Sequence, residues 1–489
     1  MTREQFEAAV NALDERIPAL SRNQIIVEIM RIVAMIGDGH TYAPVQQPPI
    51  SFRHYPVKFY WFPDGIYVLQ AEQKYAAVVG GRVVRLGNAS IQQAYDAVSK
   101  IVPRDNGSQI KWMTPFYMSL AEVLDGLGLV SDMDAVPLTV VKDGEESTVV
   151  LSPEPGEISA HDFALPPHWV DARDPKAPVP LWQQDPANHY WFKYLEDSRT
   201  LYVQFNAVAE KPDESIESFF KRVMAFADTH PLDHFVLDER LNGGGNNYLL
   251  RPIIHGFIRS DTANQSGKLF TIIGRQTFSA AMNCVNRMKL NTNTLFVGEP
   301  TGSSPNQYGD NAPLTMPNSK LVVRLSTLWW QDMDPRDTRL WQAPDLSTEL
   351  TFADYRAGRD PAMDAILHYK AEPNVSDLVA AAAEKNDREA AKAAVLAFLK
   401  NPLHKYATVE QDINQLGYNF LNAKKYDEAI FVLKLNTELY PASWNTWDSL
   451  GEAYMDCGDK DLAIQNYRKS LALNPHNAAG RDQLAKLTR

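Results

Sequence analysis

The sequence has little cysteine. Its two cysteines, Cys284 and Cys457, lie far apart in the chain. A disulfide framework needs several paired cysteines, and a structural zinc site needs closely spaced thiols or imidazoles. The histidines are scattered and show no such spacing. We therefore expect no disulfide-stabilised fold, no metal site and no organic cofactor.

Long apolar runs are also absent. The most apolar early stretch, residues 25–36, is interrupted by Glu28 and Arg31 and is too short to cross a bilayer. The N-terminal stretch MTREQFEAAVNALDER is polar and lacks the apolar core of a signal peptide. We expect no integral membrane segment, and the pattern leaves the compartment open.

Basic residues are outnumbered. Lys and Arg total 48 against 60 Asp and Glu, which gives a formal net charge of −12. Binding to phosphate backbones needs a basic field, so nucleic acid is excluded as the main partner. Hydrophobic residues make up 45% of the 489 residues, which is typical of a globular protein of several domains.

The pattern along the chain predicts a multidomain α/β protein with an all-α tail. We expect a helical segment, a β-rich module, a proline-rich linker, an α/β core and a repeat domain. Their expected bounds are residues 1–48, 49–152, 153–189, 190–371 and 372–489.

Local signals support these divisions. Ser21 and Gln24 have the spacing of a capping box at a helix start. Asp143-Gly144 between two alternating stretches is typical of a β-hairpin. The stretch GGRVVRL at residues 80–86, followed by a helical pattern, resembles a degenerate PDZ domain. After residue 190, apolar strand-like runs alternate with helical ones, which favours an α/β core with a buried sheet.

The C-terminal region repeats itself. Gly417 and Gly451 are separated by the 34-residue period of tetratricopeptide repeats. Five further pairs keep this offset: Leu416 and Leu450, Phe420 and Tyr454, Ala429 and Ala463, Leu433 and Tyr467, Pro441 and Pro475. We expect helix pairs that stack on their neighbours, with a capping helix near residues 478–487 and a divergent pair at 376–400. Such a domain offers a surface for a protein partner.

Ser279 stands where an apolar strand is expected to turn into a helix. A serine at a helix start lies near free backbone N–H groups and the positive end of the helix dipole, both of which stabilise an oxyanion. By itself, the same position also fits a serine, or the nearby Thr277, that only caps the helix.

A glycine-rich turn, Asn242-Gly243-Gly244-Gly245, directly follows the strand-like run HFVLDE. Glycines let backbone amides approach a ligand without a side-chain clash. Such a turn could supply oxyanion donors, hold a nucleotide or simply reverse the chain. The Lys-Ser/Thr of a P-loop and the G-x-G-x-x-G spacing are absent.

Taken in order, these motifs resemble a known family. LDERLNGGG at 237–245, TFSAA at 277–281 and VGEPTG at 297–302 together resemble the catalytic domain of tail-specific (C-terminal-processing) and tricorn-core serine peptidases, which is related to the crotonase and Clp-protease fold. The resemblance covers about residues 20–370. It implies Ser279 as nucleophile, with oxyanion donors from Ala280 and the Gly243-Gly244 turn.

The general base departs from one branch of that family. The processing-peptidase branch has a lysine shortly after the Gly-Glu-x-Thr motif, and residues 300–307 contain none. The tricorn-like branch has a histidine from an N-terminal segment and a late acid. His40, in Asp38-Gly39-His40-Thr41, matches that histidine. By position, Asp337 is the expected third residue, although the family's glutamate is not matched there.

Two function classes follow. The first is a serine peptidase that cleaves a peptide or protein substrate through an acyl-enzyme on Ser279, with His40 as base. The second is a silent peptide- or ligand-binding scaffold on the same fold.

Overall fold

The computed structural model describes residues 1–160 and 163–488, which fall into two compact units, 1–369 and 370–489. The first unit gathers the segments expected at 1–48, 49–152, 153–189 and 190–371, and the second begins two residues before the expected repeat domain. Among the described residues, no helix is both long enough and apolar enough to cross a membrane.

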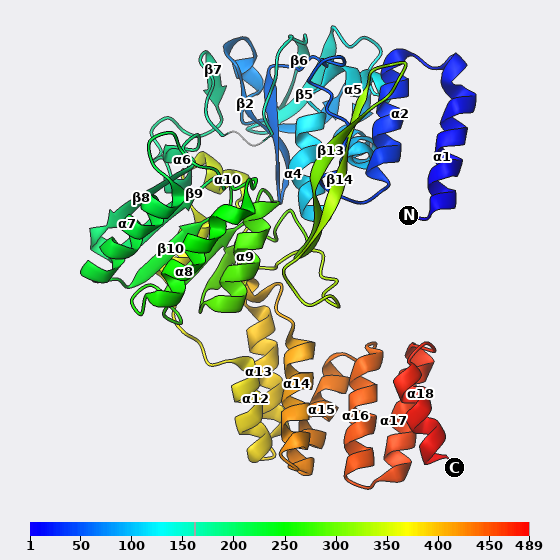
Figure 1. Ribbon diagram of the computed structural model, residues 1–489, viewed down its shortest axis with the longest axis vertical. Helices are drawn as coiled ribbons and strands as arrows, with labels where there is room; N and C mark the ends of the chain where they lie inside the picture. Colours follow the sequence, from blue (N-terminus) through cyan, green and yellow to red (C-terminus); the bar gives the residue numbers. More distant parts are fainter. Residues whose placement is uncertain (161–162, 489) are drawn as a thin grey trace. The chain divides into compact units, whose positions relative to one another are not determined.

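Two helices open the first unit (Figure 1). They are α1 (Arg3–Arg16) and α2 (Arg22–Ala34). The predicted capping box at the start of α2 is confirmed, since the Ser21 side chain accepts from Gln24 N–H and the Gln24 side chain accepts in return. After α2 the chain turns at Gly37, which has a φ of 76°, and enters the segment that carries His40.

The β-rich module forms a seven-stranded antiparallel sheet with core order β1-β2-β3-β5-β6. Its strands are β1 (Val57–Phe62), β2 (Gly65–Glu72), β3 (Arg82–Leu86), β4 (Ala89–Ser90), β5 (Val136–Lys142), β6 (Glu145–Leu151) and β7 (Trp169–Asp171). The predicted hairpin turn is confirmed: Asp143 and Gly144 both have positive φ, as a type I′ turn requires. Strand β7 comes from the expected linker and pairs with β2.

Helices pack against this sheet. They are α3 (Ile91–Val98), α4 (Gly107–Tyr117) and α5 (Ala121–Gly126). Apolar side chains from α2, α4, α5 and the strands share one buried cluster.

The α/β core is a six-stranded sheet of order β15-β12-β11-β10-β9-β8, parallel except for β8. Its strands are β8 (Tyr190–Leu195), β9 (Thr200–Phe205), β10 (His234–Asp238), β11 (Leu269–Ile273), β12 (Leu295–Gly298) and β15 (Leu346–Ser347). Every residue of β9 and β11 is buried, which explains their continuous apolar pattern. The predicted α/β core is confirmed.

Helices α7 (Ile216–Thr229), α8 (Arg251–Arg259) and α9 (Ala280–Asn291) lie next to one another over this sheet (Figure 1). Three shorter helices complete the core: α6 (Leu181–Gln184), α10 (Phe352–Arg356) and α11 (Pro361–Leu367). A long hairpin of β13 (Asn306–Thr315) and β14 (Val322–Gln331) leaves the core after β12. It meets the N-terminal segment where Tyr42 pairs with Arg324.

The second unit is entirely helical. Its helices are α12 (Val375–Glu384), α13 (Arg388–Lys400), α14 (Val409–Asn422), α15 (Tyr426–Leu439), α16 (Trp444–Asp456), α17 (Lys460–Leu473) and α18 (Ala478–Leu487). The equivalent glycines Gly417 and Gly451 face Leu433 and Tyr467 on the next helix, where an added Cβ would come within 2.5 Å and 3.2 Å of side-chain carbons. Small residues at this position let paired helices pack closely, as the repeat pattern predicted.

Candidate active site

Ser279 lies in a sharp turn between β11 and α9. It occupies the N-cap position with φ 56° and ψ −124°, a conformation that residues other than glycine rarely adopt. Its side chain makes no capping hydrogen bond to the helix. Thr277 does not cap it either, because its hydroxyl donates to the Glu239 carbonyl at 2.8 Å. Of the two readings of Ser279, simple capping is therefore excluded, and the strained backbone is typical of a functional site.

His40 meets Ser279 across 239 residues of sequence. The His40 Nε2 atom lies 2.8 Å from the Ser279 hydroxyl oxygen, a hydrogen-bond distance. The imidazole also stacks on Phe278, with ring centroids 4.4 Å apart and planes inclined by 22°. The nucleophile and base that the resemblance implied are thus in contact.

The environment of His40 keeps its imidazole neutral. Burial lowers its pKa below the ordinary value, and this effect outweighs the nearby Asp38 and Asp310 carboxylates, which raise it. An unprotonated Nε2 can accept the Ser279 proton near neutral pH, as a general base must.

The turn that carries His40 is held by two acidic side chains. The Asp38 carboxylate accepts from His40 N–H at 2.9 Å and from the Thr41 hydroxyl at 2.5 Å. Asp105 accepts from Gly39 N–H at 2.7 Å. Gly39 itself leaves no room for a side chain, since an added Cβ would lie 2.5 Å from Gln109 and 2.8 Å from Phe278.

A second set of contacts holds the Ser279 turn. The Ser279 N–H donates to the Ser303 hydroxyl at 3.0 Å, and the Gln307 side chain donates to the Ser279 carbonyl at 2.9 Å. Ser303 also lies beside Asp105, whose pKa is raised to about 6 by burial. Asp105 and Ser303 therefore connect the two turns that carry base and nucleophile. Nothing in their sequence surroundings singled them out.

The glycine turn packs directly against the nucleophile. An added Cβ on Gly244, which has a φ of 101°, would lie 2.6 Å from Ser279 Cβ and 2.9 Å from Ala280 N. The Gly244 N–H already donates to the Asn242 side chain at 3.0 Å. Within the described part of the chain, the N–H groups of Gly243 and Ala280 have no such partner. The expected pair of oxyanion donors is therefore better matched by Gly243 and Ala280, with Gly244 as the close-packed glycine.

Asp337 is the expected site residue that the structure does not bring to the others. Its carboxylate is engaged by Arg339, with Nη2 and Oδ2 2.6 Å apart, and this pairing lowers its pKa. The buried Nδ1 of His40 has no hydrogen-bond partner in the described structure. Asp337 pairs instead with Arg339, two residues away in the sequence. Its carboxylate is therefore engaged locally and does not make the contact with His40 that its position in the sequence had suggested.

A cavity of about 380 Å³ opens beside Ser279 and His40. Its lining includes His40, Ser279 and Gly243 together with the aromatic residues Trp112 and Phe116. Across the residues that the structure describes, no cluster of three or more His, Cys, Asp or Glu side chains is arranged to hold a metal ion.

Comparison with known proteins separates the two units. Residues 444–477 match the family profile of the tetratricopeptide repeat. The chain is 27% identical over 88 residues to the "Tetratricopeptide repeat domain-containing protein PYG7, chloroplastic" of Arabidopsis thaliana; the match covers 17% of this chain and 29% of that protein's length. The predicted repeat tail is confirmed.

The fold of the larger unit also has a solved counterpart. Mature CPAF, solved in complex with lactacystin, is 11% identical and aligns with 74% of this chain and 91% of its own at a TM-score of 0.53. The "photosystem II D1 C-terminal processing protease" aligns with 74% of this chain and 99% of its own at 13% identity, but its TM-score of 0.33 is too low to establish a common arrangement. The chain thus combines the fold of mature CPAF with a tetratricopeptide-repeat domain.

Proposed function

We propose that this chain is a serine peptidase with Ser279 as nucleophile and His40 as general base. The single observation that carries the proposal is the 2.8 Å contact between the Ser279 hydroxyl and His40 Nε2, made by a serine whose φ is 56°. A serine that has a strained backbone and is hydrogen-bonded to a neutral imidazole is the arrangement that nucleophilic catalysis needs. The resemblance of the motifs at 237–245, 277–281 and 297–302 to tail-specific and tricorn-core serine peptidases points to a peptide bond as the target.

The reaction would proceed through an acyl-enzyme. Ser279 Oγ attacks the carbonyl carbon of the scissile bond, and its proton moves to His40 Nε2. The N–H groups of Gly243 and Ala280 stabilise the oxyanion, His40 gives its proton to the leaving amine, and water hydrolyses the ester. His40 is oriented here by Phe278 and by its backbone contact to Asp38 rather than by Asp337.

The partners follow from the same proposal. The substrate is a peptide or protein that enters the cavity beside Ser279, and the PDZ-like module is a second surface that could select it. The repeat unit would bind a protein partner. We assign no cofactor to the reaction.

The test is labelling with a fluorophosphonate, which phosphonylates activated serines. We expect the wild-type chain to be labelled at Ser279 and the Ser279→Ala variant to lose both labelling and peptide hydrolysis, by about a millionfold in kcat for a nucleophile. Ser304→Ala, a nearby serine whose hydroxyl donates to the Leu340 carbonyl, is the matched control and should be labelled normally. Labelling at another serine would refute the nucleophile. An unlabelled but folded wild-type chain would favour the binding scaffold.

A further inference from the structure

A second cavity lies next to the active site but does not include it. It has a volume of about 120 Å³, and neither Ser279 nor His40 lines it. It is bounded by β1, α4 and α6 on one side and by the carboxyl ends of β10, β11 and β12 on the other. The crevice outside the carboxyl ends of parallel strands is where α/β sheets usually bind ligands.

Aromatic side chains form part of the walls. Tyr60, Trp61, Phe116, Phe163 and Trp182 contribute ring surface. Phe163 meets Trp182 edge to face, with centroids 5.1 Å apart. An apolar cavity of about 150 Å³ is large enough to hold benzene, so this space suits one six-membered ring.

Three buried polar atoms at this cavity have no partner in the described structure. They are the indole nitrogen of Trp182, the side-chain oxygen of Gln276 and the hydroxyl of Thr348. Leaving such groups unpaired costs free energy, so each one needs an explanation. Together they offer one donor, one acceptor and one hydroxyl that does both, which matches a ring bearing a hydroxyl or N–H group.

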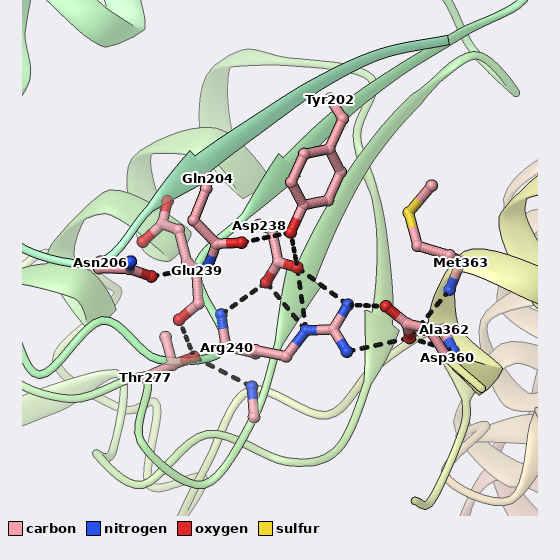
Figure 2. Close-up of polar contacts among 11 residues, drawn as sticks. Tyr202, Gln204, Asn206, Asp238, Glu239, Arg240, Thr277, Asp360, Ala362 and Met363 are labelled. Atoms are coloured by element: carbon pink, nitrogen blue, oxygen red, sulfur yellow. Dashed lines mark hydrogen bonds and ion pairs between the residues drawn. The ribbon is translucent and has the colours of Figure 1, made fainter. Parts of the chain in front are cut away.

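The two arginines in the wall are already paired. Arg275 is paired with Glu299 at 2.5 Å and lies over the Tyr60 ring. Figure 2 shows that Arg240 is held between Asp238 and Asp360, both at 2.9 Å, with Tyr202 donating to Asp238. A ligand could bind either guanidinium group only by breaking a buried ion pair, which is costly. The other cations of the lining are Lys58 and Lys111.

We infer that this cavity is a binding site for a small aromatic molecule of the phenol type. The ring packs between the aromatic side chains of the wall, and its hydroxyl pairs with the orphaned groups of Gln276, Thr348 and Trp182. The bound molecule contacts neither Ser279 nor His40, because neither residue lines the cavity. The inference stands whether or not the chain cleaves peptides.

Calorimetric titration of the full chain with two matched probes tests this. Phenol should bind, and toluene should bind more weakly because it lacks the hydroxyl. Failure of phenol to bind the folded wild-type chain, or binding of toluene as tight as that of phenol, would overturn the proposal.

Two near-isosteric variants then locate the site. Gln276→Leu and Thr348→Val should each weaken phenol binding by about tenfold and leave toluene binding unchanged or stronger. Their melting temperatures should not fall, since each removes an unsatisfied buried polar group. Gln92→Leu, at an exposed position on α3, is the control and should bind all probes as the wild type does. Unchanged phenol affinity in both cavity variants would place the probe elsewhere and refute the site.

Discussion

The two units of this chain use glycines for different kinds of contact. In the repeat unit, Gly417 and Gly451 admit the side chain of the next helix, and the whole unit is built from such contacts between neighbours. In the larger unit, Gly39 and Gly244 admit parts of the chain that are distant in sequence, namely Phe278 and Ser279. This difference shows that contacts between neighbouring helices recur with the period of the sequence repeat. The contact between His40 and Ser279 is formed once, by segments that are far apart in the sequence.

The largest effect on turnover is expected from removing the contact between His40 and Ser279. His40→Ala should lower turnover by about a hundredfold to ten-thousandfold, the range for removing a general base. Lys289→Met is the control, since Lys289 donates to the Gln342 side chain at 2.9 Å and has no contact with Ser279 in the described structure. Steady-state kinetics on a short peptide gives the comparison. A dead Lys289 variant beside a healthy His40 variant would return the chain to a serine–lysine mechanism.

The pH dependence of activity tests the same role of His40 as general base. Burial lowers the pKa of His40 from its ordinary value near 6.5. Because the base must be neutral, activity should persist through pH 6.5 on acidification and fall only below it. A profile that falls at or above pH 6.5 would contradict the assigned environment of the imidazole.

The glycines of the two units offer a direct contrast. Gly244→Ala should reduce turnover by about tenfold to a hundredfold, because the new Cβ meets backbone atoms at a φ of 101° and displaces the oxyanion turn. Gly451→Ala should leave activity unchanged, since the nearest atoms to its added Cβ belong to the Tyr467 ring, at 3.2 Å, within the repeat unit. Kinetics and thermal unfolding of both variants check this. Equal loss of activity in both variants would mean that a change within the repeat unit affects the activity of the larger unit.

The buried acid Glu239 gives the larger unit a marked pH dependence of stability. Burial raises the pKa of Glu239 to about 8, and the contact with the buried Cys284 thiol only partly opposes this rise. The folded state therefore holds the proton more tightly than the unfolded state, so stability decreases as pH rises from about 4.5 to about 8.

Glu239→Gln should remove this dependence. At pH 9 we expect the variant to be more stable than the wild type by a few kcal/mol, since each unit of pKa difference is worth about 1.4 kcal/mol. Thermal unfolding between pH 5 and pH 9 measures it, with the exposed Glu217→Gln as control. Parallel pH curves for the wild type and Glu239→Gln would refute the raised pKa.

The smallest effect is expected from removing the second unit. A chain ending at residue 369 should stay folded and keep its activity on short peptides, because residues 1–369 form a compact unit that contains Ser279 and His40. Circular dichroism and peptide hydrolysis provide the check. Loss of hydrolysis from a folded truncated chain would show that the repeat unit completes the site.

Much of the fold could be read from local patterns. The capping box at Ser21, the turn at Asp143-Gly144 and the 34-residue spacing of Gly417 and Gly451 each depend on residues that contact near neighbours in sequence. The pattern also indicated Ser279 at a strand-to-helix turn. It predicted Asp337 as the third site residue, whereas the Asp337 carboxylate pairs with Arg339, and it gave no sign of Asp105 or Ser303.

Local sequence patterns were enough to predict the helices, the strands and the repeats, and to select Ser279 and His40 as candidate site residues. The contact between His40 and Ser279 follows only from the tertiary structure. The same holds for two features of the residues that the structure describes: Gly243 rather than Gly244 has an N–H without a partner, and three polar groups are unpaired around a second cavity. The two kinds of feature differ in how far apart in the sequence the contacting residues lie. Hydrogen-bonded turns and helix periods depend on adjacent residues, whereas distance, burial and pairing at a site depend on how remote segments pack together.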